Sequence, residues 1–282
     1  MAAWLTYLKE RFPLPVYLVL VAGFVLSGQL LYGQALEWLP VVLSFIGLLV
    51  FFALLRLMDE LKDLDKDRIA HPERPLPRGL ITSDEAGTVI VAGIIFMLGW
   101  SLATALVANT AAAIAFAAVT AYLWLMYREF YCGAWLEPRP LLYAISHQLI
   151  IVPMAAFSVL VAAPGRLADA ATIQLSLPLL GAFFAYEVCR KLDPEAHPVL
   201  QTYLVVHGRG RTFSIVLVAL LVAGAGARLL ELGPILWPFE ALLLATVTVI
   251  WWRPAAYRIP ESAAGICLLA HLWAIPLKEM IA

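Results

Sequence analysis

Three aspartates, Asp59, Asp63 and Asp67, follow one another at intervals of four residues. In an α-helix this spacing turns the side chain by only about 40° per step, so the three carboxylates share one face. Three negative charges on one face repel each other unless cations lie nearby or a hard divalent metal binds their oxygens. The row therefore predicts either a salt-bridged helix end or a metal site.

The residues around this row suit both interpretations. Lys62, Lys66 and Arg68 lie among the aspartates and could neutralise them on a solvated helix end. Mg²⁺ commonly takes one or two protein carboxylates and completes its shell with substrate phosphates. Arg74 and Arg78 follow in a proline-rich loop, where they could contact such phosphates. If the row binds a metal, Mg²⁺ with a phosphorylated substrate is the expected occupant.

A second charged cluster closes an apolar run that begins at Ala170. Glu187 ends this run, and Arg190 and Lys191 follow three and four residues later, on the same helical face. One interpretation is a favourable Glu-to-Lys pair at an interfacial helix end. The other is a functional site, because ionisable residues at membrane depth usually face a bundle interior or a polar cavity. Two such helix ends on one side of a membrane could close around one diphosphate.

The elements that carry these clusters are predicted from composition. Of the 282 residues, 63% are hydrophobic and only 14% are charged, against roughly 45–50% and 25% in soluble domains. This composition excludes a soluble globular protein. A helix needs about 20 mostly apolar residues to cross a bilayer. We predict an all-α integral membrane protein, a single domain over residues 1–282 with nine spanning helices around a central cavity. Charge-poor stretches place the spans at 12–36, 38–55, 86–107, 111–127, 140–165, 170–186, 212–227, 235–252 and 262–277.

The distribution of basic residues predicts the topology. Short cytoplasmic loops carry an excess of Lys and Arg. With a cytoplasmic N-terminus, only Arg166, Arg228 and Lys278 of the 19 Lys and Arg residues lie outside, and nine spans leave the C-terminus outside. Both charged clusters then lie at the cytoplasmic face. The net charge of −1 provides no basic surplus for a nucleic-acid partner.

The aspartate row and the segment after it carry a family resemblance. Asp59-xxx-Asp63-xxx-Asp67, followed by His71-Pro-Glu-Arg-Pro-Leu-Pro77, resembles the first aspartate-rich motif of the UbiA superfamily of intramembrane prenyltransferases. That motif reads Asn/Asp-xxx-Asp-xxx-Asp and then Arg-Pro-x-Arg-Pro-Leu. The family also has nine helices with the N-terminus inside. The resemblance implies a cavity open to the inner leaflet, where Mg²⁺ bridges carboxylates of helices two and six to the diphosphate of an isoprenoid.

The resemblance also implies roles for individual residues. A tyrosine followed by a basic residue late in helix four is matched by Tyr122 and Arg128. The implied metal ligands are Asp59, Asp63, Asp67 and Glu187. The implied catalytic residues are Asp63, Asp67, Arg190, Lys191 and Tyr122, and the implied substrate contacts are Arg68, Arg74, Arg128, Arg190, Lys191 and Tyr186.

The second motif departs from the family pattern. Family members usually carry Asp-xxx-Asp on helix six, whereas this chain has Glu187 and Lys191 at those positions, with Arg190 between them. One carboxylate is thus replaced by an ammonium group. We expect this half to hold a single Mg²⁺ through Glu187 and to contact the diphosphate directly through Arg190 and Lys191.

Three functions are compatible with these patterns. The first is transfer of a prenyl group from a prenyl diphosphate to a lipophilic acceptor, aromatic or otherwise. The second is a UbiA-type terpene cyclase, which needs no acceptor. The third is a transporter, although matching broken segments in two halves, typical of transporters, are not seen. His147, seven residues into the fifth span, could bind the acceptor, act as a base, or only make an interhelical hydrogen bond.

Overall fold

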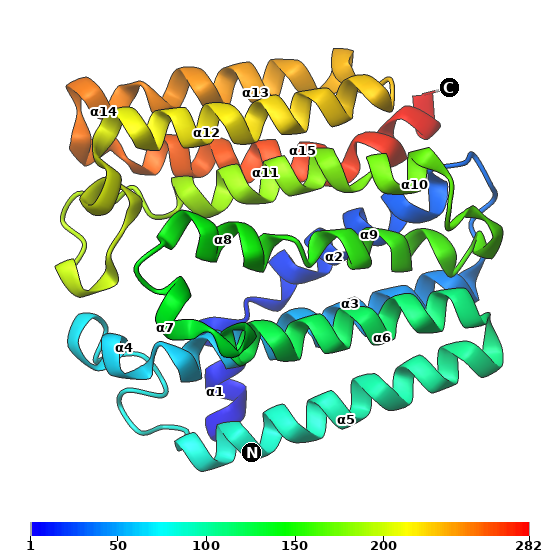
Figure 1. Ribbon diagram of the computed structural model, residues 1–282, viewed down its shortest axis with the longest axis horizontal. Helices are drawn as coiled ribbons and strands as arrows, with labels where there is room; N and C mark the ends of the chain where they lie inside the picture. The colour runs from blue at the N-terminus through cyan, green and yellow to red at the C-terminus, as the bar shows by residue number, and fades with distance from the viewer. Residues whose placement is uncertain (1, 282) are drawn as a thin grey trace.

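The computed structural model describes residues 2–281, and within this range every regular element is a helix. Long helices run side by side along the longest axis of the molecule (Figure 1). Shorter elements outside these long rows are α1 (Ala2–Arg11), α4 (Leu64–Ala70) and α7 (Gly133–Leu136), with 3-10 turns η1 (Glu129–Tyr131), η2 (Pro164–Arg166), η3 (Pro198–Leu200) and η4 (Pro254–Ala256). The others are α2 (Leu14–Leu30), α3 (Trp38–Lys62), α5 (Ser83–Val107), α6 (Thr110–Tyr127), α8 (Pro140–Gln148), α9 (Ile151–Leu160), α10 (Ala170–Gln174), α11 (Ser176–Cys189), α12 (Tyr203–Leu229), α13 (Gly233–Val247), α14 (Val249–Trp252) and α15 (Arg258–Ile281).

The number of membrane-spanning helices agrees with the sequence prediction. Eight segments of the described chain are long and apolar enough to cross a membrane. The pair α1 and α2, which is bent by 61°, brings the number to nine if it counts as one span. The predicted all-helical membrane bundle is therefore confirmed, whereas the central cavity and the side on which each terminus lies stay predictions.

The breaks within two of the spans follow from prolines. A proline ring clashes with the carbonyl group four residues earlier, which interrupts a helix. For Pro153 that carbonyl belongs to Leu149, where α8 gives way to α9. For Pro178 it belongs to Gln174, the last residue of α10. Both spans are therefore two packed segments, and the second segment of each contacts the centre of the bundle.

Five helix segments form a connected set of contacts, in which α2 contacts α3, α9 and α15, and α11 contacts α9 and α15. Small residues let helices approach closely in a membrane protein. A Cβ atom on Gly181 of α11 would lie 2.4 Å from the carbonyl oxygen of Ala219 in α12. This glycine therefore fixes α11 against α12, and with it the position of Glu187 near the end of α11.

A buried pair joins two helices near the C-terminus. His271 of α15 lies 3.0 Å from Glu240 of α13 through its Nε2 atom, and its Nδ1 atom bonds the carbonyl oxygen of Cys267. Because a carbonyl oxygen only accepts, Nδ1 carries the proton. Polar residues at membrane depth usually pair with one another or with backbone carbonyl groups. His271 has a partner of each kind and is therefore a buried packing residue.

Helix α1 is tied to the end of α3 by a buried acidic residue. Glu60, which is 4% exposed, forms ion pairs with Arg11 of α1 and, at 2.9 Å, with Arg56 one turn earlier in α3. Glu10 of α1 binds Arg78 in the loop after α4, with an N–O distance of 2.9 Å. The sequence prediction placed no helix before the first span, and it missed both links.

The Glu60→Ala variant is expected to lower the free energy of unfolding by about 2 kcal/mol, because two guanidinium groups lose their shared counter-charge in a largely buried position. Thermal melting of the purified protein in detergent measures this loss. The matched control is Glu37→Ala, since Glu37 is exposed and makes no capping bond at the start of α3. Equal melting temperatures for the two variants would contradict the assignment of Glu60 as the link.

Candidate active site

The three aspartates of the row remain on one hydrogen-bonded ladder. The amide of Asp63 donates to the carbonyl of Asp59 at 2.9 Å, and that of Asp67 donates to the carbonyl of Asp63 at 2.8 Å. A turn at Asp63 (φ −87°, ψ 4°) separates α3 from α4 without breaking this ladder. The helical hydrogen-bond register that the sequence predicted for the three aspartates is therefore retained.

The three carboxylates have different surroundings. Asp67 is buried, and the Nη1 atom of Arg74 contacts its two oxygens at 2.7 and 2.8 Å. Asp59 is half-buried and Asp63 is exposed. Within residues 2–281 neither of these two side chains makes a hydrogen bond or an ion pair. The row thus offers two free carboxylates, whereas Asp67 and Arg74, predicted as a metal ligand and a substrate contact, neutralise each other.

The other arginines of this segment also have protein partners. Arg68 binds the exposed Asp65 at 2.9 Å, three residues earlier on α4. Arg78 binds Glu10 and the carbonyl oxygen of Glu73. The hydrogen bond with Glu10 raises the pKa of Arg78. The structure therefore places the predicted substrate contact Arg68 on the exposed side of α4, paired with Asp65.

The second charged cluster forms at the end of α11, as its spacing predicted. The carboxylate of Glu187 lies 2.5 Å from Nε of Arg190 and 2.6 Å from Nζ of Lys191. The carboxylate of Glu187 raises the pKa of Arg190, and the charge of Asp59 acts in the same direction. Both oxygens of Glu187 thus face cations of its own helix end, and the cluster carries one net positive charge.

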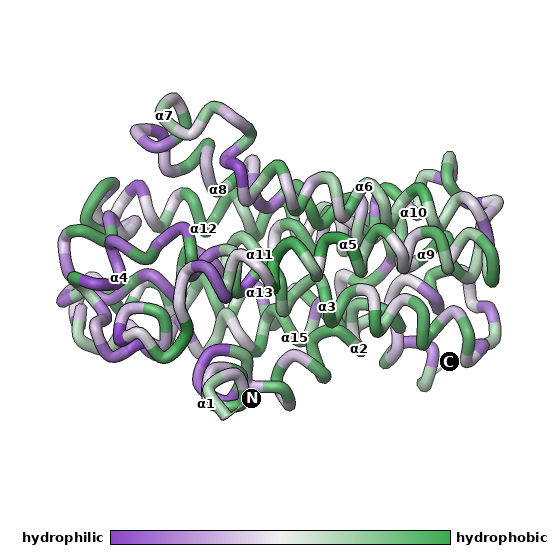
Figure 2. The backbone as a smooth tube through the Cα atoms, turned by 90° about the horizontal axis from the view of Figure 1, so that it is seen from below, coloured by the Kyte–Doolittle hydropathy of each residue, from purple (hydrophilic) through white to green (hydrophobic). Residues whose placement is uncertain are grey.

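The two clusters lie at the same end of the bundle and act on each other. The positive charge of Arg190 acts on the carboxylate of Asp59 in α3. Tyr17 of α2 lies close to both groups and to Tyr186. The short helix α4 contacts η3, which belongs to the loop that follows α11. Figure 2 shows hydrophilic segments gathered at this end around α4, whereas the middle of the long helices is hydrophobic.

The donor set of this region suits Mg²⁺ together with a phosphorylated substrate. Within residues 2–281 no three His, Cys, Asp or Glu side chains converge on one point as a ready-made metal cage. Mg²⁺ uses few protein carboxylates and takes its other ligands from phosphates and water. Asp59 and Asp63 supply two such oxygen ligands. The four carboxylates predicted as one metal set, Asp59, Asp63, Asp67 and Glu187, thus divide into two free ones and two that are paired.

Tyr122 and Arg128, the two residues predicted as site residues late in the fourth span, contact different partners. The hydroxyl group of Tyr122 donates to the carbonyl oxygen of Ser146 at 2.6 Å, and its ring meets the edge of Phe130. Arg128 is exposed at the end of α6, where its guanidinium lies 5.6 Å from the ring centre of Tyr131. Tyr186 is half-buried on α11. The structure therefore brings Tyr186 near the two clusters but does not join Tyr122 to Arg128.

Three polar residues next to the row were not predicted as site residues. Lys62 donates to the hydroxyl oxygen of Tyr143 at 2.9 Å and to the carbonyl oxygen of Met126 at 3.3 Å. Tyr143 in turn donates to Glu129 at 3.3 Å. These residues come from α3, α8 and η1, so no spacing along the chain relates them. The only sequence signal was Lys62 itself, which was interpreted as a neutralising neighbour of the aspartates.

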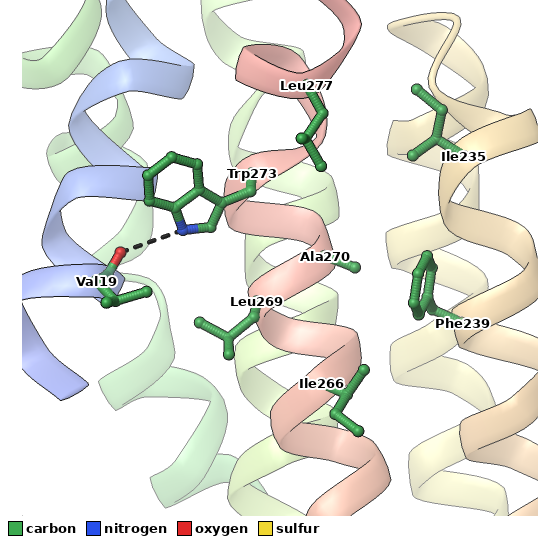
Figure 3. Close-up of a pocket in the computed structure, with 8 residues that line it drawn as sticks. All are labelled: Val19, Ile235, Phe239, Ile266, Leu269, Ala270, Trp273 and Leu277. Carbon is green, nitrogen blue, oxygen red and sulfur yellow. Dashed lines mark hydrogen bonds between the residues drawn. The ribbon is translucent and has the colours of Figure 1, made fainter.

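An apolar groove opens between α2, α13 and α15 (Figure 3). Its volume is about 320 Å³, and the indole N–H of Trp273 donates to the carbonyl oxygen of Val19 at its wall. It is lined by Val19, Ile235, Phe239, Ile266, Leu269, Ala270, Trp273 and Leu277, all without charge. The groove lies along the membrane-spanning helices, apart from the charged helix ends, and offers space for an apolar chain.

Comparison with known proteins decides the family. The sequence model of the UbiA prenyltransferase family matches residues 6–275. The chain belongs to this family. The resemblance predicted from the aspartate row is thereby confirmed, and membership supports prenyl transfer within a membrane as the activity of this multi-pass UbiA protein.

One solved structure has the same fold along its whole length. It comes from a study of digeranylgeranylglyceryl phosphate synthase in membranes, and it shares 16% of its residues with this UbiA protein. The alignment covers 100% of each chain with a TM-score of 0.64. At this identity the likeness shows the fold. No curated protein matches the sequence significantly.

Proposed function

We propose that this UbiA protein is a Mg²⁺-dependent intramembrane prenyltransferase that transfers an isoprenoid from a prenyl diphosphate to a lipophilic acceptor. One observation carries the proposal. Two free carboxylates, Asp59 and Asp63, lie at the same end of the bundle as Arg190 and Lys191, and the charges of Asp59 and Arg190 act on each other. Free carboxylates suit a divalent cation, and a positive helix end suits a diphosphate.

The residues of the two helix ends would stabilise the departing diphosphate. When the bond between C1 of the isoprenoid and the diphosphate oxygen breaks, the electron pair goes to the diphosphate. Bound Mg²⁺ supplies Lewis-acid stabilisation of that charge. Arg190 and Lys191 bind the other phosphate oxygens, and Glu187 holds both cations in place. Such fixed charges act before the bond breaks and need no rearrangement.

The aromatic residues near the clusters suit the carbocation that remains on the isoprenoid. Tyr17 of α2 lies close to Asp59, Arg190 and Tyr186. An aromatic face attracts a nearby cation by roughly 0.5–2 kcal/mol. The apolar tail of the isoprenoid would extend from this end along the membrane-spanning helices. The residues that line the groove between α2, α13 and α15 carry no charge. By the positive-inside rule, this charged end faces the cytoplasm.

The reaction can be tested with purified protein in lipid nanodiscs. The donor is geranylgeranyl diphosphate, with Mg²⁺ or with EDTA, and the acceptors are geranylgeranylglyceryl phosphate and 4-hydroxybenzoate, each added separately or omitted. The first acceptor is chosen because the similar solved structure is a digeranylgeranylglyceryl phosphate synthase. We expect diphosphate release that needs Mg²⁺ and a prenylated acceptor identified by mass spectrometry. A cyclic hydrocarbon or alcohol formed without acceptor would instead indicate a terpene cyclase, and no diphosphate release would contradict both.

A further inference from the structure

Lys62, Tyr143 and Glu129 form a hydrogen-bonded array beside the aspartate row. The ammonium group of Lys62 donates to the hydroxyl oxygen of Tyr143, and the hydroxyl group donates to Oε1 of Glu129. Lys62 precedes Asp63 in the chain. The negative charges of Asp59 and Asp63 act on the Tyr143 hydroxyl together with that of Glu129. The array therefore borders the region to which the diphosphate is assigned.

The backbone that presents Glu129 is strained. Glu129, Phe130 and Tyr131 have φ angles of 49°, 53° and 57°, so three consecutive residues with a Cβ atom adopt a left-handed conformation. Residues held in this region cluster at functional sites, because the surrounding structure must impose the conformation. A Cβ atom on Gly133 would lie 2.1 Å from Oε2 of Glu129. The carboxylate of Glu129 therefore reaches Tyr143 from an unfavourable left-handed turn, and this arrangement requires a glycine at position 133.

His147 packs against the other side of Tyr143. The two rings stack with centres 4.1 Å apart, and Nδ1 of His147 lies 2.8 Å from the carbonyl oxygen of Tyr143. Because that carbonyl only accepts, Nδ1 donates, and Nε2 is left as a buried acceptor with no partner among the described residues. The ring of Tyr143 is therefore fixed on one face, and its oxygen is aimed at Lys62 and Glu129.

The hydroxyl oxygen of Tyr143 keeps one acceptor position. It accepts one hydrogen bond from Lys62 and gives its own proton to Glu129, and a hydroxyl oxygen can accept a second. We propose that this position receives the proton of an acceptor that carries a hydroxyl group. Tyr143 is then a catalytic residue of prenyl transfer, and Glu129 and Lys62 are positioning residues that act through it.

The step balances without a further reactant. The bond between C1 of the isoprenoid and the diphosphate breaks, with its electron pair leaving on the diphosphate. The acceptor oxygen forms a new bond to C1, and its proton passes to the oxygen of Tyr143. The proton of Tyr143 passes to Glu129, which later returns it to water. A positioned proton relay of this kind contributes about 10²–10⁴-fold to a rate.

The array favours an acceptor hydroxyl group over an aromatic ring carbon as the attacking atom. A hydroxyl proton is weakly acidic, so its removal during attack makes the oxygen a better nucleophile. A ring carbon loses its proton only after the new bond has formed, from a strongly acidic cation that water or diphosphate can deprotonate. This inference rests on the proposed function and adds the chemical class of the acceptor.

The test compares two variants that remove one group each, Tyr143→Phe and Glu129→Gln, with the wild type in nanodiscs. The donor is geranylgeranyl diphosphate, and the hydroxyl acceptors are geranylgeranylglyceryl phosphate and geranylgeraniol. We expect kcat for transfer to fall about 100-fold, with the KM for geranylgeranyl diphosphate unchanged. The Kd for the slowly reacting analogue geranylgeranyl thiolodiphosphate, measured with Mg²⁺, is expected to stay at the wild-type value, whereas a merely structural loss would raise it.

The matched control is Glu137→Gln, because Glu137 is exposed on the same connection between α6 and α8 and makes no ion pair within residues 2–281. It should leave kcat and this Kd unchanged. Wild-type kcat in Tyr143→Phe, or prenylation of 4-hydroxybenzoate on its ring while neither hydroxyl acceptor reacts, would overturn the relay. If the wild type releases no diphosphate with any of the acceptors, the proposed function fails instead.

Discussion

The Asp63→Asn variant is expected to lower the rate of prenyl transfer about 10³-fold while its melting temperature stays at the wild-type value. The expected loss corresponds to removing a preorganised charge that stabilises the transition state. Asp63 is exposed, and its side chain makes no ion pair within residues 2–281. Packing therefore does not depend on its charge, and the loss should fall on Mg²⁺-dependent chemistry alone.

The same short segment offers a matched control for this prediction. Asp65 lies two residues later, and its side chain is 91% exposed and, within residues 2–281, bound only to Arg68. Rates for Asp65→Asn and Asp63→Asn, measured as product formed at saturating geranylgeranyl diphosphate and Mg²⁺, separate a specific role from a general loss of negative charge. Full activity in Asp63→Asn, or an equal loss in Asp65→Asn, would refute the assignment of Asp63 to the metal.

The Asp67→Ala variant is expected to lose stability as well as activity. Removing this buried carboxylate leaves Arg74, whose side chain is 25% exposed, without its counter-charge. Breaking a fully buried pair costs about 3–5 kcal/mol. We expect about 3 kcal/mol here because Arg74 is partly exposed. Unfolding in detergent, followed by circular dichroism, measures the change.

A double-mutant cycle with Arg74→Ala identifies the cause of this loss. If the two side chains stabilise the protein through each other, Asp67→Ala/Arg74→Ala is destabilised by less than the sum of the single variants. The interaction lost in the single variants would then be the ion pair that connects the loop after α4 to α4. If Asp67→Ala instead keeps wild-type stability and loses only activity, Asp67 is a metal ligand, as the sequence predicted.

Much of the fold follows from local patterns in the sequence. The nine apolar stretches depend only on composition over about 20 residues, and the ladder of Asp59, Asp63 and Asp67 depends only on helical spacing. The pairing of Glu187 with Arg190 and Lys191 is also local, since the partners lie three and four residues away. These features were therefore predictable without knowledge of the tertiary structure.

The sequence did not predict that Asp67 is paired whereas Asp59 and Asp63 are free. Asp67 meets Arg74 because the proline-rich loop turns back, and the spacing of seven residues carries no signal for that contact. The link between Glu60 and Arg11 spans 49 residues. The array around Tyr143 joins three separate elements. It depends on a left-handed turn at residues 129–131, where the sequence has no glycine or asparagine to predict such a turn. Such contacts arise only when the helices pack.

The most direct test of the account is a structure of the protein in nanodiscs with Mg²⁺ and geranylgeranyl thiolodiphosphate, a donor analogue that reacts slowly. We predict density for the diphosphate between the end of α3 and the end of α11, in contact with Arg190 and Lys191. Density for a metal ion should join it to Asp59 and Asp63, with the ion pair of Asp67 and Arg74 intact. A diphosphate bound elsewhere, or one whose metal ions leave Asp59 and Asp63 free, would contradict the proposed active site.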